Sequence, residues 1–341
     1  MRYITGKFGC WLLGVGCWLL TACSSSSDET GEGAGSPLQI LPYTASYHET
    51  DFGMRDVSAR YNPFTPAGDI AVGLYVFPAE TPTVKSISYH NGSWTSQVIV
   101  QGGDEYTLYG FMPKKDPISS SISKSGEVVT LTLSGLGVVN TDDVCFVTGV
   151  KGAEGDLLQG QFTYTGKTKD NTVRLLMDHL FAAVRFRFLV DADYSALRTI
   201  KLRSLALRTT QGTVTATITL TPNTEDTNPA SVAYEPSGTP TTTSFFTSAE
   251  GVEIPTSDVE DVEFVGYIVP SSSSGLTLVT TYDVYDSNGN LVREDCTAEN
   301  TLPDLNAKRG DKVTLELTVA PTYLYQLSDP DLDNPTITIG N

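Results

Sequence analysis

Residues 214–220 read Val-Thr-Ala-Thr-Ile-Thr-Leu, a strict alternation of apolar and hydroxyl-bearing side chains. Successive side chains of an extended strand point to opposite faces, so Val214, Ala216, Ile218 and Leu220 share one face and the threonines the other. A strand with one buried and one solvated face is typical of an antiparallel sheet. This stretch therefore predicts a half-buried β-strand.

Similar short runs, rich in β-branched and aromatic residues, recur along the chain. They are Ile70–Phe77, Trp94–Val100, Glu105–Met112, Val128–Leu133, Val144–Val150, Leu180–Val190, Thr199–Leu207, Val262–Val269, Leu276–Tyr285 and Lys312–Val319. Two Asn-Gly pairs, Asn91-Gly92 and Asn288-Gly289, predict tight hairpin turns. The best helical candidate is a turn or two at Asp193–Leu197, capped by Asp191. The fold class is therefore predicted to be all-β, built of antiparallel β-sandwiches.

The length of 341 residues, 40% of them hydrophobic, favours two domains in tandem. The expected parts are a signal peptide at 1–22, a tether at 23–36, an N-terminal sandwich at 37–170 and a C-terminal sandwich at 171–341, ending in a tail at about 320–341. The polar stretch Gln161–Asn171 sets the boundary between the sandwiches. The Pro/Thr/Ser-rich segment Thr221–Ser244 is expected to form a long surface loop.

The N-terminus carries an export signal. Two basic residues, Arg2 and Lys7, precede an apolar run from Phe8 to Leu20, and Leu20-Thr21-Ala22-Cys23 follows. A basic flank, a short apolar run and small residues before a cysteine are typical of a bacterial lipoprotein signal. Cys23 is therefore the predicted lipidation site. The Ser- and Gly-rich stretch after it has the composition of a flexible tether.

The charge balance excludes one class of partner. With 40 acidic against 22 basic residues the formal net charge is −18, which repels phosphate backbones, so nucleic-acid binding is not expected. Three widely separated histidines make a multi-His metal centre unexpected, and no cofactor is predicted. The sequence has no Gly-x-Ser-x-Gly elbow, and no histidine is evident beside Cys145, so no enzyme is predicted.

Two weaker motifs leave alternatives open. Asp329, Asp331 and Asp333 resemble the start of a calcium loop, but Asn334 and Gly340 stand where glycine and glutamate are needed. A solvated acidic turn explains them better. Cys145 and Cys296 are the two cysteines of the body of the chain; a disulfide between them is arithmetically possible, although Cys145 lies in an apolar run that suits a core residue.

The C-terminal tail contains two extended pieces. Tyr323, Tyr325 and Leu327 project to one side of the first, and Ile337 and Ile339 to one side of the second. The tail has no Lys or Arg, the residues that protect a free sheet edge. It is either an edge strand of its own domain or a strand donated to another subunit.

The N-terminal counterpart is the apolar segment Leu38–Tyr43, which is expected to form the first strand. A polar connector, Glu49–Ala67, follows it and contains Arg55 and Arg60. A cut after either arginine would free the first strand together with the lipid anchor. The vacated groove would then present unpaired backbone groups to a strand from a neighbour.

Several stretches, in this order along the chain, resemble the fimbrillin-like (type V pilin) lipoproteins of gut and oral anaerobes. They are the lipobox with its Ser-rich tether, Gly68–Val76, Tyr106–Pro113, His179–Phe186 and Lys308–Leu315. The resemblance implies two transthyretin-like β-sandwich domains and export as an outer-membrane lipoprotein precursor. It also implies removal of the first strand by an Arg-specific protease, with Arg60 or Arg55 as the cleavage residue. Polymerisation by donor-strand exchange would follow, with Tyr323–Leu327 and Ile337–Ile339 as the donor segment. His179 and Arg185 also lie in these stretches, and we interpret them as structural.

The sequence thus predicts a structural subunit of a cell-surface fimbria. Its expected partners are other copies of itself or related pilins, the outer membrane through the Cys23 lipid, an Arg-specific protease, and a host surface or other bacteria. The alternative is a surface-anchored adhesin or glycan-binding lipoprotein that does not polymerise. In that alternative Trp94, Tyr282 and Tyr285 are candidates for stacking on sugars.

Overall fold

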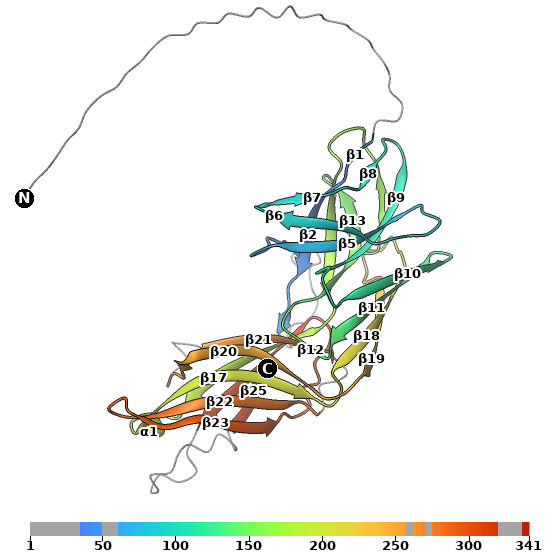
Figure 1. The fold of residues 1–341 in the computed structure, drawn as a ribbon. Coiled ribbons are helices and arrows are strands. Elements are labelled where there is room, and N and C mark those ends of the chain that lie inside the picture. The colour runs from blue at the N-terminus through green and yellow to red at the C-terminus, as the bar shows by residue number, and fades with distance from the viewer. Residues whose placement is uncertain (1–34, 50–60, 257–261, 271–274, 320–335, 341) are drawn as a thin grey trace, which may run out of the picture. The chain divides into compact units, whose positions relative to one another are not determined.

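The structure is a computed structural model and describes residues 35–49, 61–256, 262–270, 275–319 and 336–340. Within these residues the regular structure is almost entirely β-strand, with one short helix, α1 (Ala192–Ser195). The strands form antiparallel-rich sheets, shown in Figure 1. The predicted all-β class is confirmed.

The largest sheet has nine strands, and the N-terminal strand β2 lies inside it rather than at its edge. The order is β4-β2-β15-β13-β9-β5-β6-β7, with β14 also beside β9. The strands are β2 (Gln39–Ala45), β4 (Tyr61–Pro63), β5 (Ile70–Phe77), β6 (Lys85–His90), β7 (Ser93–Thr95), β9 (Glu105–Met112), β13 (Cys145–Gly152), β14 (Thr163–Thr165) and β15 (Thr172–His179). A separate short pair joins β1 (Ser36–Pro37) to β8 (Ile99–Val100).

A four-stranded sheet completes the first sandwich. Its order is β10 (Ser119–Ser125), β11 (Val128–Gly137), β18 (Thr213–Leu220) and β19 (Ala230–Ser237). One hydrophobic core contains Leu74, Phe111 and Leu175 from the nine-stranded sheet together with Leu131 and Ile218 from this one. Two sheets that bury their apolar faces against each other define a β-sandwich.

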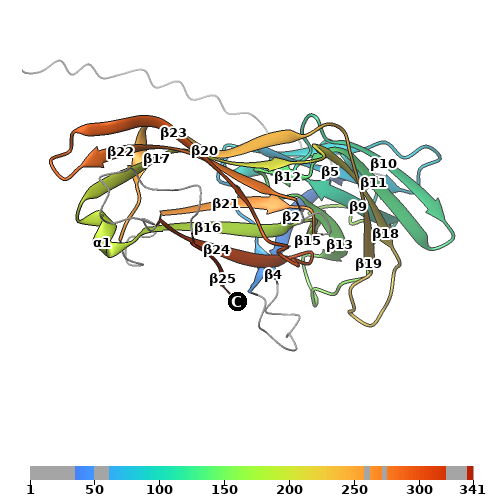
Figure 2. The same ribbon diagram turned by 90° about the horizontal axis from the view of Figure 1, so that it is seen from below.

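The second sandwich is built from two further sheets. One contains β12 (Val139–Asn140), β21 (Val262–Ile268), β16 (Ala182–Val190), β24 (Asp311–Val319) and β25 (Thr336–Gly340) in that order, with β3 (His48–Glu49) also beside β24. The other contains β20 (Thr241–Glu253), β17 (Arg198–Thr209), β22 (Thr277–Asp286) and β23 (Leu291–Thr301). Figure 2 shows β16, β21 and β24 side by side. Phe186 and Leu315 share a second core with Ile200, Leu278 and Val284.

Local sequence signals are confirmed where they rest on short-range chemistry. Asn91 and Gly92 have φ values of 49° and 82°, the left-handed pair that a tight hairpin turn requires, and they join β6 to β7. The side chain of Asp191 accepts hydrogen bonds from the backbone N–H groups of Asp193 and Tyr194 and caps α1, as predicted. In β18 the four alternating apolar residues are buried, at 1% exposure or less.

Long-range pairing departs from two expectations. Sheet membership does not change at residue 170, because β15 follows that point and pairs with β13 and β2. The segment 221–244, expected to be a surface loop, contains β19 and the start of β20. In β19 exposed and half-buried side chains alternate strictly, and its backbone is paired with the half-buried strand β18. The loop expectation was therefore wrong.

Candidate functional site

The predicted function depends on the position of β2 between its neighbouring strands β4 and β15. β2 runs parallel to β15 from Gln39↔Thr172 to Thr44↔Met177, and antiparallel to β4 on its other side. Leu38 and Ile40 are fully buried in the first core, whereas Leu41 is 45% exposed. The period of two along the strand explains this alternation. β2 thus fills a groove between two strands and supplies part of the core.

The predicted cleavage residues Arg55 and Arg60 lie in the segment 50–60, outside the described residues. The described chain stops at the end of β3 and resumes at Tyr61, the first residue of β4. The segment that holds both arginines therefore joins β3 to β4, the strand beside β2. Cys23, the predicted lipidation site, also lies outside the described residues.

The predicted donor residues are only partly described. Tyr323, Tyr325 and Leu327 lie outside the described residues, as does the acidic stretch 329–333. Ile337 and Ile339 belong to β25, which pairs antiparallel with β24 of the same chain through Ile337↔Leu317 and Ile339↔Leu315. This is the edge-strand arrangement that the sequence left open; a donor role for the tail stays a prediction.

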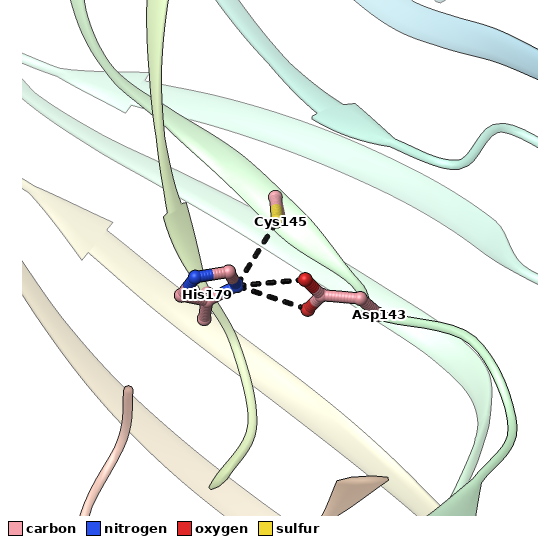
Figure 3. Close-up of side chains that lie close together, drawn as sticks. All are labelled: Asp143, Cys145 and His179. Atoms are coloured by element: carbon pink, nitrogen blue, oxygen red, sulfur yellow. Dashed lines mark hydrogen bonds and ion pairs between the residues drawn. The ribbon is translucent and has the colours of Figure 1, made fainter. Parts of the chain in front are cut away.

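An acid, a thiol and an imidazole lie close together where β13 begins and β15 ends. The register places Cys145 directly opposite His179, and Asp143 lies two residues before Cys145. His179 Nδ1 lies 3.5 Å from Cys145 Sγ, 3.0 Å from Asp143 Oδ1 and 2.8 Å from Asp143 Oδ2, as Figure 3 shows. The expectation that Cys145 has no neighbouring histidine is therefore wrong, because strand pairing joins residues 34 positions apart.

The chain that follows β2 covers this cluster. His179 Nε2 donates a hydrogen bond to the Ala45 carbonyl oxygen at 2.6 Å. The Tyr47 ring stacks on the His179 ring with centroids 3.6 Å apart, and the Tyr47 hydroxyl donates to Asp143 Oδ1 at 2.7 Å. The cluster of Asp143, Cys145 and His179 is thus completed by residues that precede both candidate cleavage arginines.

A second buried network holds the other side of the same segment. The Tyr61 hydroxyl donates to Asp178, and Gln159 donates to the Tyr61 hydroxyl. The Asp178 carboxylate, whose side chain is 1% exposed, also accepts from Arg309 Nη1 at 3.4 Å. Buried polar networks of this kind fix the positions of their members. The adjacent residues Asp178 and His179 therefore anchor β4 and the β2–β3 connection, respectively.

The Cys145 thiol is held in its protonated form. Burial, followed by the negative charge of Asp143, raises the pKa of the Cys145 thiol well above its usual value. Burial and the same carboxylate also raise the pKa of Tyr267 to about 12. The thiolate is the reactive form of cysteine, and here both the thiol and the carboxylate face the same ring nitrogen. In a nucleophilic relay they would face opposite nitrogens. The arrangement is that of a structural cysteine.

Cys145 is therefore expected to resist alkylation in the folded protein. In a chain carrying Cys23→Ser and Cys296→Ser, iodoacetamide should modify Cys145 at least about tenfold more slowly than in the same chain unfolded in guanidinium chloride. Mass spectrometry of the time course measures both rates. Equal rates in the two states would contradict the burial and the protonated thiol described above.

The remaining predicted residues fall in different places. Cys145 is a buried free thiol in the first core, and Cys296 is a buried free thiol in the second core. The disulfide between them that the sequence left open is therefore not formed. Tyr282 is buried, at 6% exposure, and cannot stack on a sugar. Trp94 packs on Tyr89, and Lys201 lies over Tyr285. Arg185 pairs with Glu263 across β16 and β21.

Comparison with known proteins finds no matching family and no matching curated protein. Several solved structures are similar. A fimbrial protein from Bacteroides vulgatus is 13% identical, with a TM-score of 0.47 over 89% of this chain and 98% of that one. The fimbrial anchor protein Mfa2 from Porphyromonas gingivalis is 12% identical, with a TM-score of 0.29 over 88% and 97%. The similar structures thus include fimbrial proteins and proteins described as cell adhesion proteins, the kinds of protein that the sequence motifs resemble.

No helix among the described residues has the length and hydrophobicity needed to cross a bilayer.

Proposed function

We propose that this chain is a structural subunit of a cell-surface fimbria. It is exported as a lipoprotein through Cys23, cut after Arg55 or Arg60, and polymerised by exchange of a strand between subunits. It has no enzymatic activity in this role. The observation that carries the proposal is the position of β2, inside the nine-stranded sheet and followed by β3 and then by the segment with both arginines that leads to β4.

Removal of β2 leaves an open groove in which binding of another strand is strongly favourable. β15 loses its parallel partner along Thr172–Met177, and β4 loses its neighbour. Unpaired backbone groups away from water are costly, at about 1–3 kcal/mol each. Burial of the Leu38 and Ile40 side chains contributes about 1.5–3 kcal/mol each to stability. This contribution is lost when the groove is open.

The C-terminal tail supports the donor role. β25 lies at the edge of its sheet, where it is paired on one side only, so it can leave without breaking the sheet. The tail carries no Lys or Arg, and it places Ile337 and Ile339 two residues apart. Leu38, directly before β2, and Ile40 within it have the same spacing. A strand with this pattern can offer two apolar side chains to the groove that β2 vacates.

Limited proteolysis tests the proposal directly. Treatment of the mature chain with an Arg-specific protease should give a product that begins at Asp56 or Tyr61, and negative-stain electron microscopy should then show filaments. A chain carrying Arg55→Lys and Arg60→Lys keeps both charges but offers no arginine in this segment, so it should stay intact and monomeric. N-terminal sequencing identifies the cut.

The non-polymerising alternative makes a different prediction for the same sample. A cleaved product that stays monomeric and keeps the excised N-terminal fragment (residues 23–55 or 23–60) bound would contradict strand exchange. Retention of binding to a glycan array by that monomer would favour the adhesin.

A further inference from the structure

The cluster of Asp143, Cys145 and His179 contains the donor atoms of a metal site. A carboxylate oxygen, a sulfur and an imidazole nitrogen all lie within 4.8 Å of one another. They come from the beginning of β13 and the end of β15, two paired strands whose register is fixed by the core around them. The sequence predicted no metal site, since the three residues are separated along the chain and only one of them is histidine.

The hydrogen bond on the far side of the histidine ring decides which nitrogen is available. The Ala45 carbonyl oxygen can only accept, so Nε2 carries a proton, and in the neutral ring that binds a metal Nδ1 carries the lone pair. The Nδ1 lone pair then points at the Asp143 carboxylate and the Cys145 sulfur. Three electron-rich atoms that face one another need a cation between them, either a proton or a metal. A backbone carbonyl on the second ring nitrogen is the usual support of a metal-ligating histidine.

The separations suit zinc. Zinc bound at about 2.0–2.1 Å from nitrogen and 2.3 Å from sulfur in a tetrahedron places these ligand atoms roughly 3.4–3.6 Å apart. The distance of 3.5 Å between Cys145 Sγ and His179 Nδ1 already fits. The distance of 2.8 Å between His179 and the nearer Asp143 oxygen must open by several tenths of an ångström, which rotation of the half-exposed Asp143 side chain allows. The Tyr47 hydroxyl, 2.7 Å from Asp143 Oδ1, donates a hydrogen bond to this ligand.

We propose that Asp143, Cys145 and His179 bind one Zn²⁺ ion, which the segment Ala45–Tyr47 covers. Binding replaces the thiol proton with the metal, and the proton is released to solvent. Ala45, the last residue of β2, and Tyr47 hydrogen-bond to the ligands His179 and Asp143, so the ion fixes the groups that hold the end of β2. This site does not depend on polymerisation, so it is tested on the uncleaved chain.

Cobalt serves as a spectroscopic probe of the site. The metal-free mature chain, carrying Cys23→Ser so that no lipid is attached, is titrated with Co²⁺ and then with Zn²⁺. We expect one Co²⁺ per chain, with a near-ultraviolet thiolate-to-cobalt charge-transfer band and the visible bands of tetrahedral Co²⁺. One equivalent of Zn²⁺ should abolish them. Absence of the charge-transfer band would overturn the proposal and leave a proton between the three groups.

Matched variants assign the ligands. Cys145→Ser should remove the charge-transfer band, whereas Cys296→Ser, at the buried cysteine of the other core, should leave it intact. Asp143→Asn keeps the shape of the side chain and should weaken Zn²⁺ binding by about tenfold or more in isothermal titration calorimetry, and Tyr47→Phe by about 10–100-fold. Circular dichroism checks that each variant folds. A folded Asp143→Asn chain with unchanged affinity, or a band that survives Cys145→Ser, would contradict the assignment.

Discussion

A chain that begins at Tyr61 is expected to be unstable alone, and a synthetic peptide of residues 36–49 is expected to restore its stability. The truncated chain lacks β2, so the groove between β4 and β15 is open and the first core loses Leu38 and Ile40. Replacement of either residue by alanine in the intact chain should already cost about 2–5 kcal/mol of unfolding free energy. Loss of both, together with the backbone pairing of β2, should bring the truncated chain close to unfolding at room temperature.

The peptide experiment measures how strongly the groove between β4 and β15 binds the β2 segment. Thermal melts followed by circular dichroism should show a large upward shift of the melting temperature when the peptide is added, and fluorescence anisotropy of a labelled peptide gives its affinity. Ile40→Ala in the peptide should weaken binding at least about tenfold, since about 1.4 kcal/mol is enough for that factor. Leu41→Ala is the matched control: this side chain is 45% exposed, and its loss should change the affinity about twofold or less.

Two results would contradict this reading. A truncated chain with the melting temperature of the intact one would show that β2 contributes little to the fold. Equal losses from Ile40→Ala and Leu41→Ala would show that the peptide binds without the register of β2 and β15.

The sequence predicted what short-range chemistry controls. The alternation in 214–220 specifies a half-buried strand wherever that strand is placed, and Asn91-Gly92 specifies a turn because it tolerates the left-handed backbone on both residues. Asp191 caps α1 through contacts two and three residues away. Each of these signals is complete within a few residues, so it survives without knowledge of the rest of the fold.

The candidate site depends on register, which the sequence does not display. Cys145 faces His179 because β13 pairs with β15, and a register shift between Val147 and Gly149 interrupts that pairing. The covering carbonyl of Ala45 is 134 residues from His179 and reaches it only through the parallel pairing of β2 with β15. A one-residue slip would turn these side chains to the other face. Nothing local in Asp143-Val144-Cys145 signals a metal site.

Two complementary variants are expected to abolish filaments in opposite ways. A chain that ends at Val319 lacks the tail, so after cleavage it has an open groove and no strand to donate. Before cleavage it should remain folded, because β24 keeps its parallel pairing with β16 along eight residue pairs. The chain carrying Arg55→Lys and Arg60→Lys keeps β2 in its groove, so it can donate its tail and cannot accept one. Neither variant alone should form filaments after treatment with the protease.

A mixture of the two variants separates strand exchange from any other mode of association. Each has one functional end, so equal amounts should combine into dimers and no further, which size-exclusion chromatography with light scattering measures as twice the monomer mass. Small amounts of either variant added to the intact chain should shorten its filaments, because each blocks one end. Filaments from the tail-less chain would show that the donor is not the C-terminal segment. Filaments from the uncleaved chain would show that β2 need not leave. Since only the groove and the tail distinguish the two variants, dimers confined to the mixture require that one subunit supplies the strand that the other has lost.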